Sequence, residues 1–426
     1  MFHVLTSPGR LDRLRSWFGR WSGLMPLFVA EFILWIGFGA LLPVLPIYFT
    51  EHGVDIALLG VVVAAWPAAK LVTEPIFGWV ADHARSRVPL MAAGLLISGV
   101  AIGLSVIFTG PVPFFILRAI AGLGTAMYDP AARGVVTDAT PPDARGEAFG
   151  VYGAAQMGGL LLGPAFGGLG AAMFGGLAFV FGFSALALAL GALAVFLRVR
   201  DPKGASNPTT AAGEVPTDAA VDETPGFGPP PASLWNRLIA IAILINFAGW
   251  FSGGMYEVVW SLFLTDRGAG LDLVGLTFAT FAVPVLVLSP AAGRWVDRRG
   301  PTPFMIGGVL LMSAMAASYP FIPDPRWAVP MIAIEGTGFA LLGPASYAVI
   351  AAGSPLGRSS TAQGIVAAFG TFATISASIM AGILAAIDLR YPFWIGAAVA
   401  IVLALVAFAV DGGRIGRRFA SPSPAT

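Results

Sequence analysis

The stretch EFILWIGFG at residues 31–39 returns as NFAGWFSGG at residues 246–254. The similarity extends without a gap from residues 31–82 to residues 246–297. Identical pairs fall in the same order along both segments: Trp35 and Trp250, Gly60 and Gly275, Pro75 and Pro290, Gly78 and Gly293, and Asp82 and Asp297. Ordered matches of this kind across several elements indicate an internal duplication. We therefore expect two parallel structural repeats.

The composition places these repeats in a membrane. Of the 426 residues, 57% are hydrophobic and only 11% are charged, whereas an ordinary soluble domain has about 25% charged residues. Segments of 18 or more residues that are almost free of charge can cross a bilayer as helices. We therefore predict an all-α integral membrane protein with twelve transmembrane helices in two six-helix bundles. The spans are expected at residues 24–49, 58–81, 88–109, 112–137, 147–172, 176–197, 235–264, 273–296, 303–322, 328–352, 362–386 and 391–411.

The basic residues are distributed unevenly between the two ends of these helices. Nineteen of the 24 Lys and Arg residues, including Arg133, fall in segments on the side of the N-terminus. The opposite loops hold only Arg267, Arg326 and Arg390. Positively charged loops stay in the cytoplasm. Both termini are therefore predicted to be cytoplasmic, in a multi-pass protein of the plasma (bacterial inner) membrane.

Polar segments divide the chain into five parts. Residues 1–23 suit a short amphipathic helix on the inner membrane surface, and residues 24–200 hold the first bundle. Residues 201–233 are rich in Pro, Ala, Thr and Gly and are expected to be a disordered cytoplasmic linker. Residues 234–411 hold the second bundle, and residues 412–426 form a cytoplasmic tail.

The sequence also argues against several classes of function. It has no cysteine, and its three histidines, His3, His52 and His83, lie outside the apolar spans, so no metal site is expected. It contains neither a GxxxxGK[ST] phosphate loop nor a GxSxG nucleophile elbow. A net charge of +1 gives no nucleic-acid footprint. We expect a protein that is not an enzyme and does not bind nucleic acid.

Four motifs carry a resemblance to a known family. Residues 78–87 read GWVADHARSR and residues 293–300 read GRWVDRRG, and both resemble the G-x-x-x-D-R-x-G-R-R loop of the major facilitator superfamily. Residues 118–124, RAIAGLG, resemble the buried-arginine motif of that family. Residues 159–168, GLLLGPAFGG, match its antiporter motif. The end of the first span, with Pro43 and Pro46, is similar to the twelve-helix drug:proton antiporters.

The resemblance implies a gating role for these motifs. The loop motifs would form charge clusters that latch the two bundles together on the cytoplasmic side while the cavity faces outward, with Arg85 or Arg87 reaching Asp82. The antiporter-motif glycines are four residues apart, so they share a helix face that lets another backbone approach closely, and Pro164 permits a kink. The gating candidates are Gly78, Asp82, Arg85, Arg87, Asp138, Arg145, Gly159, Gly163, Pro164, Gly167, Gly293, Asp297 and Arg298.

Seven charged side chains lie at or near membrane depth: Glu31, Lys70, Glu74, Arg118, Asp129, Glu257 and Glu335. Each costs about 2.5–3.5 kcal/mol at the centre of a span on an insertion scale, so each should face a cavity or a partner. Lys70 and Glu74 are one helical turn apart and can pair with each other. Arg118 could pair with a carboxylate and change its proton affinity.

Glu31 is our first choice for the proton carrier. No basic residue stands one turn away from it, and a carboxyl group in such a site can hold or release a proton near neutral pH. The resemblance implies that its span lines the cavity, where an acid binds protons or cationic drugs. Arg118, Glu74, Glu257 and Glu335 complete the proton-coupling candidates. The substrate-cavity candidates are Glu31, Lys70, Asp129, Gln156, Asn246, Tyr256 and Tyr347.

These features favour a secondary transporter that exports amphipathic or cationic small molecules in exchange for protons by alternating access. We expect a proton as the coupling ion, no cofactor, and a monomer whose partners are a small-molecule substrate and the bilayer. The alternative is an exporter of a specific metabolite, such as a sugar, an organic acid or a lysolipid. A membrane sensor built on the same fold is less favoured, because the linker carries no signalling domain.

Overall fold

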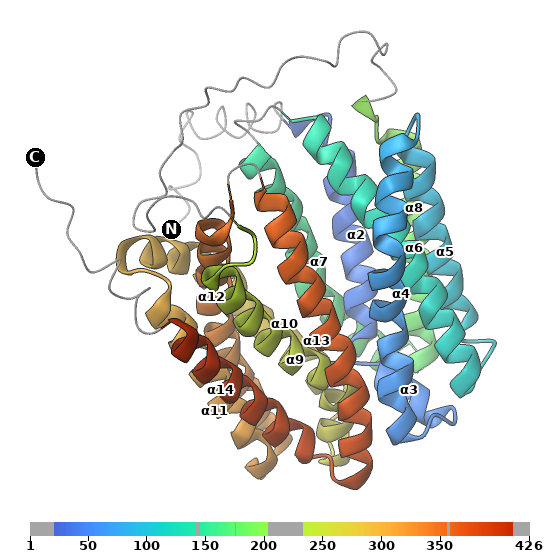
Figure 1. Cartoon of the computed structure of the whole chain (residues 1–426). Helices are drawn as coiled ribbons and strands as arrows, with labels where there is room; N and C mark the ends of the chain where they lie inside the picture. Colours follow the sequence, from blue (N-terminus) through green and yellow to red (C-terminus); the bar gives the residue numbers. More distant parts are fainter. Residues whose placement is uncertain (1–20, 141–144, 175, 203–232, 356–357, 412–426) are drawn as a thin grey trace, which may run out of the picture.

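The computed structural model describes residues 21–140, 145–174, 176–202, 233–355 and 358–411, without the side chains of residues 145–147, 297, 359–360 and 411. Regular structure within these residues is helical, with no strand (Figure 1). The helices are α2 (Met25–Leu41), α3 (Leu45–Glu51), α4 (Ile56–His83), α5 (Val88–Leu104), α6 (Pro111–Asp138), α7 (Arg145–Met173), α8 (Leu177–Arg198), α9 (Arg237–Asp266), α10 (Leu271–Arg299), α11 (Thr302–Ser318), α12 (Ala328–Gly353), α13 (Ser359–Ile387) and α14 (Tyr391–Asp411), with short 3₁₀ turns η4 (Tyr319–Phe321) and η5 (Pro325–Trp327).

Each predicted span after the first contains one helix whose ends agree with the prediction to within about five residues, and the first span is covered by α2 and α3 together. Among the described residues, nine helices are long and apolar enough to cross a bilayer, and the bent pair α2 and α3 would make a tenth. The apolar helix α5 has 17 residues, and the glycine-rich α7 has 29. The predicted amphipathic helix, most of the linker and the C-terminal tail lie outside the described residues.

The first span is broken rather than continuous. Helices α2 and α3 meet at an angle of 45° across residues 42–44. Pro43 lies within this break and Pro46 is the second residue of α3. A proline in a helix interior removes a backbone hydrogen bond and clashes with the preceding turn, whereas it is tolerated in the first turn of a helix. The prolines noted in the sequence therefore re-aim the end of the span.

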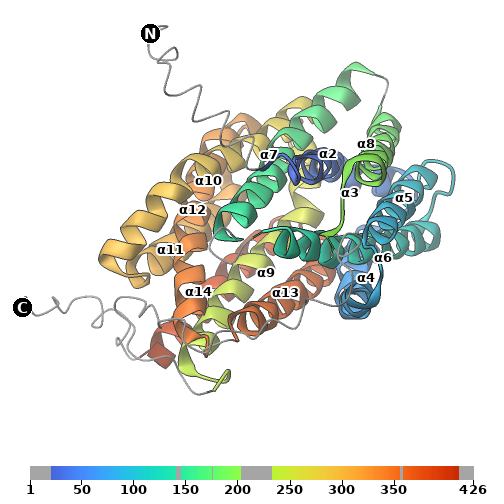
Figure 2. The ribbon, with the colours of Figure 1, turned by 90° about the horizontal axis from the view of Figure 1, so that it is seen from above.

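The two halves of the chain repeat the same packing. In the first half α2 packs against α7 and α8, α4 against α6, and α5 against α6 and α8. In the second half α9 packs against α13 and α14, α10 against α12, and α11 against α12 and α14. These neighbours correspond helix by helix, as an internal duplication requires. Seen from above, the two groups of helices lie side by side (Figure 2).

The halves meet through two helix crossings, α4 with α13 and α7 with α10. A Cβ built on Gly60 of α4 would lie 3.1 Å from the Gly382 nitrogen of α13. A Cβ built on Gly168 of α7 would lie 3.1 Å from the Gly275 Cα of α10. Gly60 and Gly275 are a matched pair of the repeat, offset by 215 residues, and Gly168 and Gly382 are offset by 214. The two crossings are therefore related by the same internal symmetry.

Both crossings lie toward one end of the molecule, which we call the far end. It is the end at which α4 and α10 begin and α7 and α13 finish, at the bottom of Figure 1. The opposite end, where α8 finishes and α9 begins, is called the linker end. Because glycine lets backbones approach closely, the halves are closed against each other at the far end.

A leucine at position 275 should force the far end open. The ideal Cβ would lie 2.5 Å from the Pro164 carbonyl oxygen of the other half, which a side chain cannot occupy without separating α7 from α10. The chain has no native cysteine, so Ser378→Cys, buried in the other crossing, can report on opening. In detergent, we expect a maleimide to label Ser378→Cys several-fold faster in the Gly275→Leu background.

Gly307→Leu is the matched control, because nothing lies within 4 Å of a Cβ at that position. Equal labelling rates in the two leucine backgrounds would show that the glycine crossings do not hold the far end closed.

Candidate functional site

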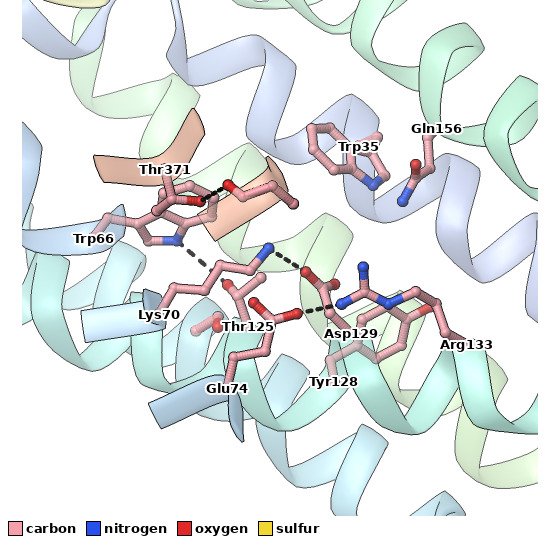
Figure 3. Close-up of polar contacts among 12 residues, drawn as sticks. Trp35, Trp66, Lys70, Glu74, Thr125, Tyr128, Asp129, Arg133, Gln156 and Thr371 are labelled. Carbon is pink, nitrogen blue, oxygen red and sulfur yellow. Dashed lines mark hydrogen bonds and ion pairs between the residues drawn. The ribbon is translucent and has the colours of Figure 1, made fainter. Parts of the chain in front are cut away.

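A ladder of polar pairs joins α4 to α6 in the first half. The Trp66 indole Nε1 donates to the Thr125 hydroxyl at 3.3 Å, the Lys70 ammonium bonds to the Asp129 carboxylate, and the Arg133 guanidinium bonds to the Glu74 carboxylate (Figure 3). The partners in every pair are 59 residues apart, and successive pairs are four residues apart on each helix. Because α4 and α6 run in the same direction, one register places all three pairs face to face.

The ladder corrects one expectation. Lys70 and Glu74 were predicted to pair along a single helix, but each finds its partner on α6 instead. Arg133, counted among the charges near the N-terminal side, lies inside α6 and neutralises Glu74. The signal was present in the sequence, since Lys-x-x-x-Glu on one span and Asp-x-x-x-Arg on another are complementary when the helices are parallel.

The side chains of the ladder are exposed to different extents. The Asp129 side chain is 9% exposed and Lys70 21%, whereas Glu74 is 29% and Arg133 49% exposed. Lys70 lies halfway along α4, and the more exposed pair follows one turn nearer the linker end. The ladder therefore becomes more accessible toward the linker end.

Glu31 lies beside this ladder and is completely buried. Its carboxylate accepts hydrogen bonds from the Trp35 indole at 2.9 Å, the Tyr128 hydroxyl at 2.6 Å and the Gln156 amide at 2.6 Å. These donors come from α2, α6 and α7, so Glu31 ties three helices together. All three donors are neutral, and thus Glu31 is the one carboxylate of the five charged groups here without a cation among its described partners.

Helices α2 and α7 approach closely enough to build this site because of the helix α7 glycines. A Cβ on Gly159 would lie 2.7 Å from the Trp35 Cβ, and one on Gly163 would lie 2.7 Å from the Gly39 Cα. Gly167 faces the Ala40 carbonyl in the same way. The close crossing brings Gln156, one turn before Gly159, within reach of Glu31.

A further ionic pair, outside the ladder, joins the first half to the second half. The Arg118 guanidinium of α6 contacts the Glu257 carboxylate of α9 at 3.2 Å and also donates to the Val63 carbonyl at 3.0 Å. Arg118 Cζ lies 5.9 Å from the centre of the Trp66 ring, and Lys70 Nζ lies 5.5 Å from it. Trp66, the member of the ladder nearest the far end, therefore lies close both to Lys70 and to the pair that connects the halves.

Glu335 forms a third acidic site in the second half. It is buried on α12 and accepts a hydrogen bond of 2.6 Å from the Tyr319 hydroxyl. The Tyr256 ring packs edge-on against Tyr319, with centroids 6.3 Å apart. Tyr256 therefore belongs with Glu335 rather than with the ladder.

Two other cavity candidates are not brought into these clusters. Asn246, the repeat counterpart of Glu31, has its side-chain oxygen buried without a described hydrogen-bond partner and lies against Gly370 of α13. Tyr347 is 68% exposed, and its hydroxyl makes no hydrogen bond to a described residue. Neither makes a described hydrogen bond to the Glu31 site, and their place in the cavity stays a prediction.

The loop motif of the first half forms a cluster that joins two of the gating candidates to one residue that was not predicted. The Arg87 guanidinium pairs with Asp138 at the end of α6 and lies 4.0 Å from Asp201, beyond α8. The Arg87 backbone N–H also donates to Asp201 at 2.6 Å. All three belong to the first half, so the cluster fastens the ends of its helices to one another. Arg85 is exposed, and Asp82 ends α4 beside this cluster in sequence.

The remaining gating candidates are less informative. Gly78 has open space around its α-carbon apart from Pro130 at 3.8 Å, and Gly293 has nothing within 4 Å. Arg298 is exposed at the end of α10. The side chains of Arg145 and Asp297 lie outside the described residues.

Comparison with known proteins identifies the family of this fold. Residues 27–260 and 239–422 match the sequence profile of the Major Facilitator Superfamily. The chain belongs to the Major Facilitator Superfamily. As a member of this family, whose model matches both halves of the chain, it is a multi-pass membrane transporter and not an enzyme.

Two curated relatives of this chain share only 25–27% sequence identity with it. The chain is 27% identical over 180 residues to the quinolone resistance protein NorA of Staphylococcus aureus (strain MRSA252), which covers 42% of this chain and 45% of NorA. The match thus spans less than half the length of that relative. It is 25% identical over 377 residues to multidrug resistance protein 1 of Bacillus subtilis (strain 168), covering 85% of this chain and 90% of the relative.

Solved structures agree with the fold. A bacterial homologue of the human lysosomal transporter Spinster, in an inward-facing and unoccupied conformation, superposes with a TM-score of 0.70 at 17% identity, covering 95% of this chain and 99% of that one. The nucleoside transporter NupG superposes with a TM-score of 0.73 at 14% identity, covering 91% of this chain and 98% of that one. At these identities the likeness concerns the fold alone.

The contacts of Arg87 allow a prediction about the stability of this transporter. Arg87→Gln should lower the free energy of unfolding by about 3 kcal/mol, because it removes the buried cation that the Asp138 and Asp201 carboxylates share. Thermal unfolding in detergent measures the effect. Arg298→Gln removes an exposed charge at the equivalent end of the second half and should change stability by less than about 0.5 kcal/mol. A similar change in both variants would contradict a specific role for Arg87.

Proposed function

We propose that this chain is a proton-coupled exporter of amphipathic or cationic small molecules that works by alternating access. The antiporter motif of α7 and the names of the two relatives support export over uptake. The excess of Lys and Arg near the linker end supports cytoplasmic termini in the plasma membrane. On this proposal the protein acts as a monomer, and the proton is its only coupling partner.

The observation that carries the proposal is the charge balance around Glu31. Two cations, Lys70 and Arg133, are each paired with one carboxylate of the ladder, which leaves Glu31 as the surplus acid. A carboxylate without a counter-charge at membrane depth is expensive, so it favours taking up a proton or a cation. When Glu31 is protonated, the Tyr128 hydroxyl can rotate, or the Gln156 amide can flip, to accept a hydrogen bond from it, whereas the Trp35 indole remains a donor.

The exchange follows from competition for negative charge. Loading a proton from outside would neutralise Glu31 and weaken the hold of the first half on a cationic substrate, which then leaves. Release of the proton inside restores the charge and the affinity. Each net charge that moves across the membrane contributes about 2.3 kcal/mol per 100 mV.

We also place Glu257 and Glu335 on the proton route. Glu257 is held by Arg118 across the halves near the end that we assign to the outside, and protonation of Glu257 would cancel that attraction. The far end could then open. With the far end closed, we take the present conformation to be open toward the cytoplasm.

Glu31→Gln should abolish coupling while leaving the fold intact. Glutamine has nearly the same shape and keeps a hydrogen-bonding group among Trp35, Tyr128 and Gln156. In vesicles reconstituted with the variant and held under a pH gradient, we expect lipophilic cations to trigger less than about a tenth of the wild-type proton flux. Glu51→Gln, an exposed acid at the far end, is the control. Full cation-triggered flux in Glu31→Gln would remove this residue from the mechanism.

Glu257→Gln should weaken the contact between the two halves at the far end. Loss of the ion pair with Arg118 removes the ionic attraction between α6 and α9, so Ser378→Cys should be labelled faster by a maleimide than in the wild-type background. The double variant Arg118→Gln/Glu257→Gln should behave like Glu257→Gln alone, because the second change removes a partner that is already lost. Unchanged labelling in Glu257→Gln would count against a gating role for the pair.

The same vesicles test the alternative exporter of a metabolite. Exchange of one sugar, organic acid or lysolipid that is independent of lipophilic cations would favour that alternative and overturn the broader proposal.

A further inference from the structure

The Lys70 ammonium occupies a place that has the chemistry of a cation-binding site. It is paired with the Asp129 carboxylate and lies 5.5 Å from the centre of the Trp66 ring (Figure 3). A carboxylate beside the face of an indole is the combination that proteins use to bind organic ammonium groups. Lys70 thus fills a site that an unattached cation could also fill.

The Asp129 carboxylate can accept more hydrogen bonds than the one that it receives from Lys70. Its side chain is 9% exposed, and its Oδ1 atom is buried without a described hydrogen-bond partner. A buried carboxylate oxygen without a donor is costly, and a carboxylate can accept several hydrogen bonds. One oxygen is therefore left for a further donor or charge.

Glu31 cannot take this role in the present conformation. It is completely buried and already accepts from Trp35, Tyr128 and Gln156, so an entering cation would have to displace those side chains first. The Asp129 side chain is 9% exposed, and its described ion-pair partner is Lys70, whose side chain is 21% exposed. Of the two acids, Asp129 is therefore the more accessible to an entering cation.

We propose that Asp129 and Trp66 form the subsite for the cationic group of the substrate, and that the Lys70 ammonium occupies this subsite while the transporter is empty. The proposal rests on the function proposed above and names where its cationic substrates bind. An entering cation displaces Lys70 from Asp129. Lys70 is one helical turn from Glu74 and can share that carboxylate with Arg133.

Lys70 acts as an internal competitor for the subsite. The apparent affinity for a cationic ligand is the intrinsic affinity multiplied by the fraction of time for which the subsite is free of Lys70. Removing it should therefore tighten binding, although most changes in a binding site weaken it. We expect Lys70→Met to bind tetraphenylphosphonium about tenfold more tightly than wild type, a change of about 1.4 kcal/mol. Binding to purified protein in detergent is followed by tryptophan fluorescence and checked by calorimetry.

The anion tetraphenylborate has the same shape and the opposite charge, so it separates charge recognition from apolar contact. It should bind Lys70→Met no more tightly than wild type. Asp129→Asn should lose at least tenfold in affinity for tetraphenylphosphonium, and Trp66→Leu several-fold, with little change for tetraphenylborate. Equal changes for both ions would overturn the proposal.

Arg133→Gln controls for a general change of potential. It removes the same charge one turn away without emptying the subsite, so tightening should be clearly weaker than in Lys70→Met. Equal tightening in both variants would show that Lys70 acts only through its field, and weaker binding in Lys70→Met would show that it helps to hold the substrate. Either result overturns the competition.

Lys70→Met leaves Asp129 without a counter-charge and could fold poorly. Lys70→Gln keeps a donor for Asp129 and should tighten tetraphenylphosphonium binding by a smaller factor, whereas Lys70→Arg keeps the competitor and should not tighten it. If Lys70→Met does not fold, tightening in Lys70→Gln decides the matter, and its absence overturns the proposal.

These measurements need neither a membrane nor a proton gradient. Loss of proton flux in vesicles with the expected binding pattern would therefore count against the exchange mechanism, whereas intact flux with unchanged binding in the Lys70 variants would count against the subsite alone.

Discussion

A charge placed in the hydrocarbon layer must have an opposite charge or a hydrogen-bonding partner within reach, and this requirement organises the first half of the transporter. Lys70 and Glu74 on α4 meet Asp129 and Arg133 on α6 because the two helices are parallel and share one register. A shift of one residue along either helix would turn these partners away from each other and leave four charges unpaired. The ladder therefore fixes how α4 and α6 pack as well as what the site offers to a ligand.

The ladder also lies next to the ion pair that joins the two halves. Trp66 contacts Lys70 on one side and Arg118 on the other, and Arg118 reaches across to Glu257 in the second half. A cation that displaces Lys70 would thus act within one aromatic ring of the pair that links the halves. On the function proposed here, binding and opening are adjacent events, and no long route between distant sites is required.

Much of the fold could be predicted from the sequence, because long apolar segments, the uneven basic residues and the repeat each report on one-dimensional properties of the chain. Glu31 and the α7 glycines also stood out, since each is conspicuous within its own span. The pairing of the charges could not be predicted in the same way. Lys70 with Glu74 is the pair that spacing along one helix suggests, whereas the pairs that form depend on how α4 is oriented against α6. Arg87 and Asp138 were both among the gating candidates, but Asp201, the third member of their cluster, was not predicted because it lies 114 residues from Arg87 in the chain.

The two glycine crossings have a mechanical consequence. Gly60 with Gly382 and Gly168 with Gly275 are two places where glycines let backbones of opposite halves meet closely, and two points determine a line. A rigid body that keeps both points fixed retains one degree of freedom, rotation about that line. Tilting would then be permitted and sliding forbidden, so each wall of the central site would turn as a unit with its internal bonds unbroken.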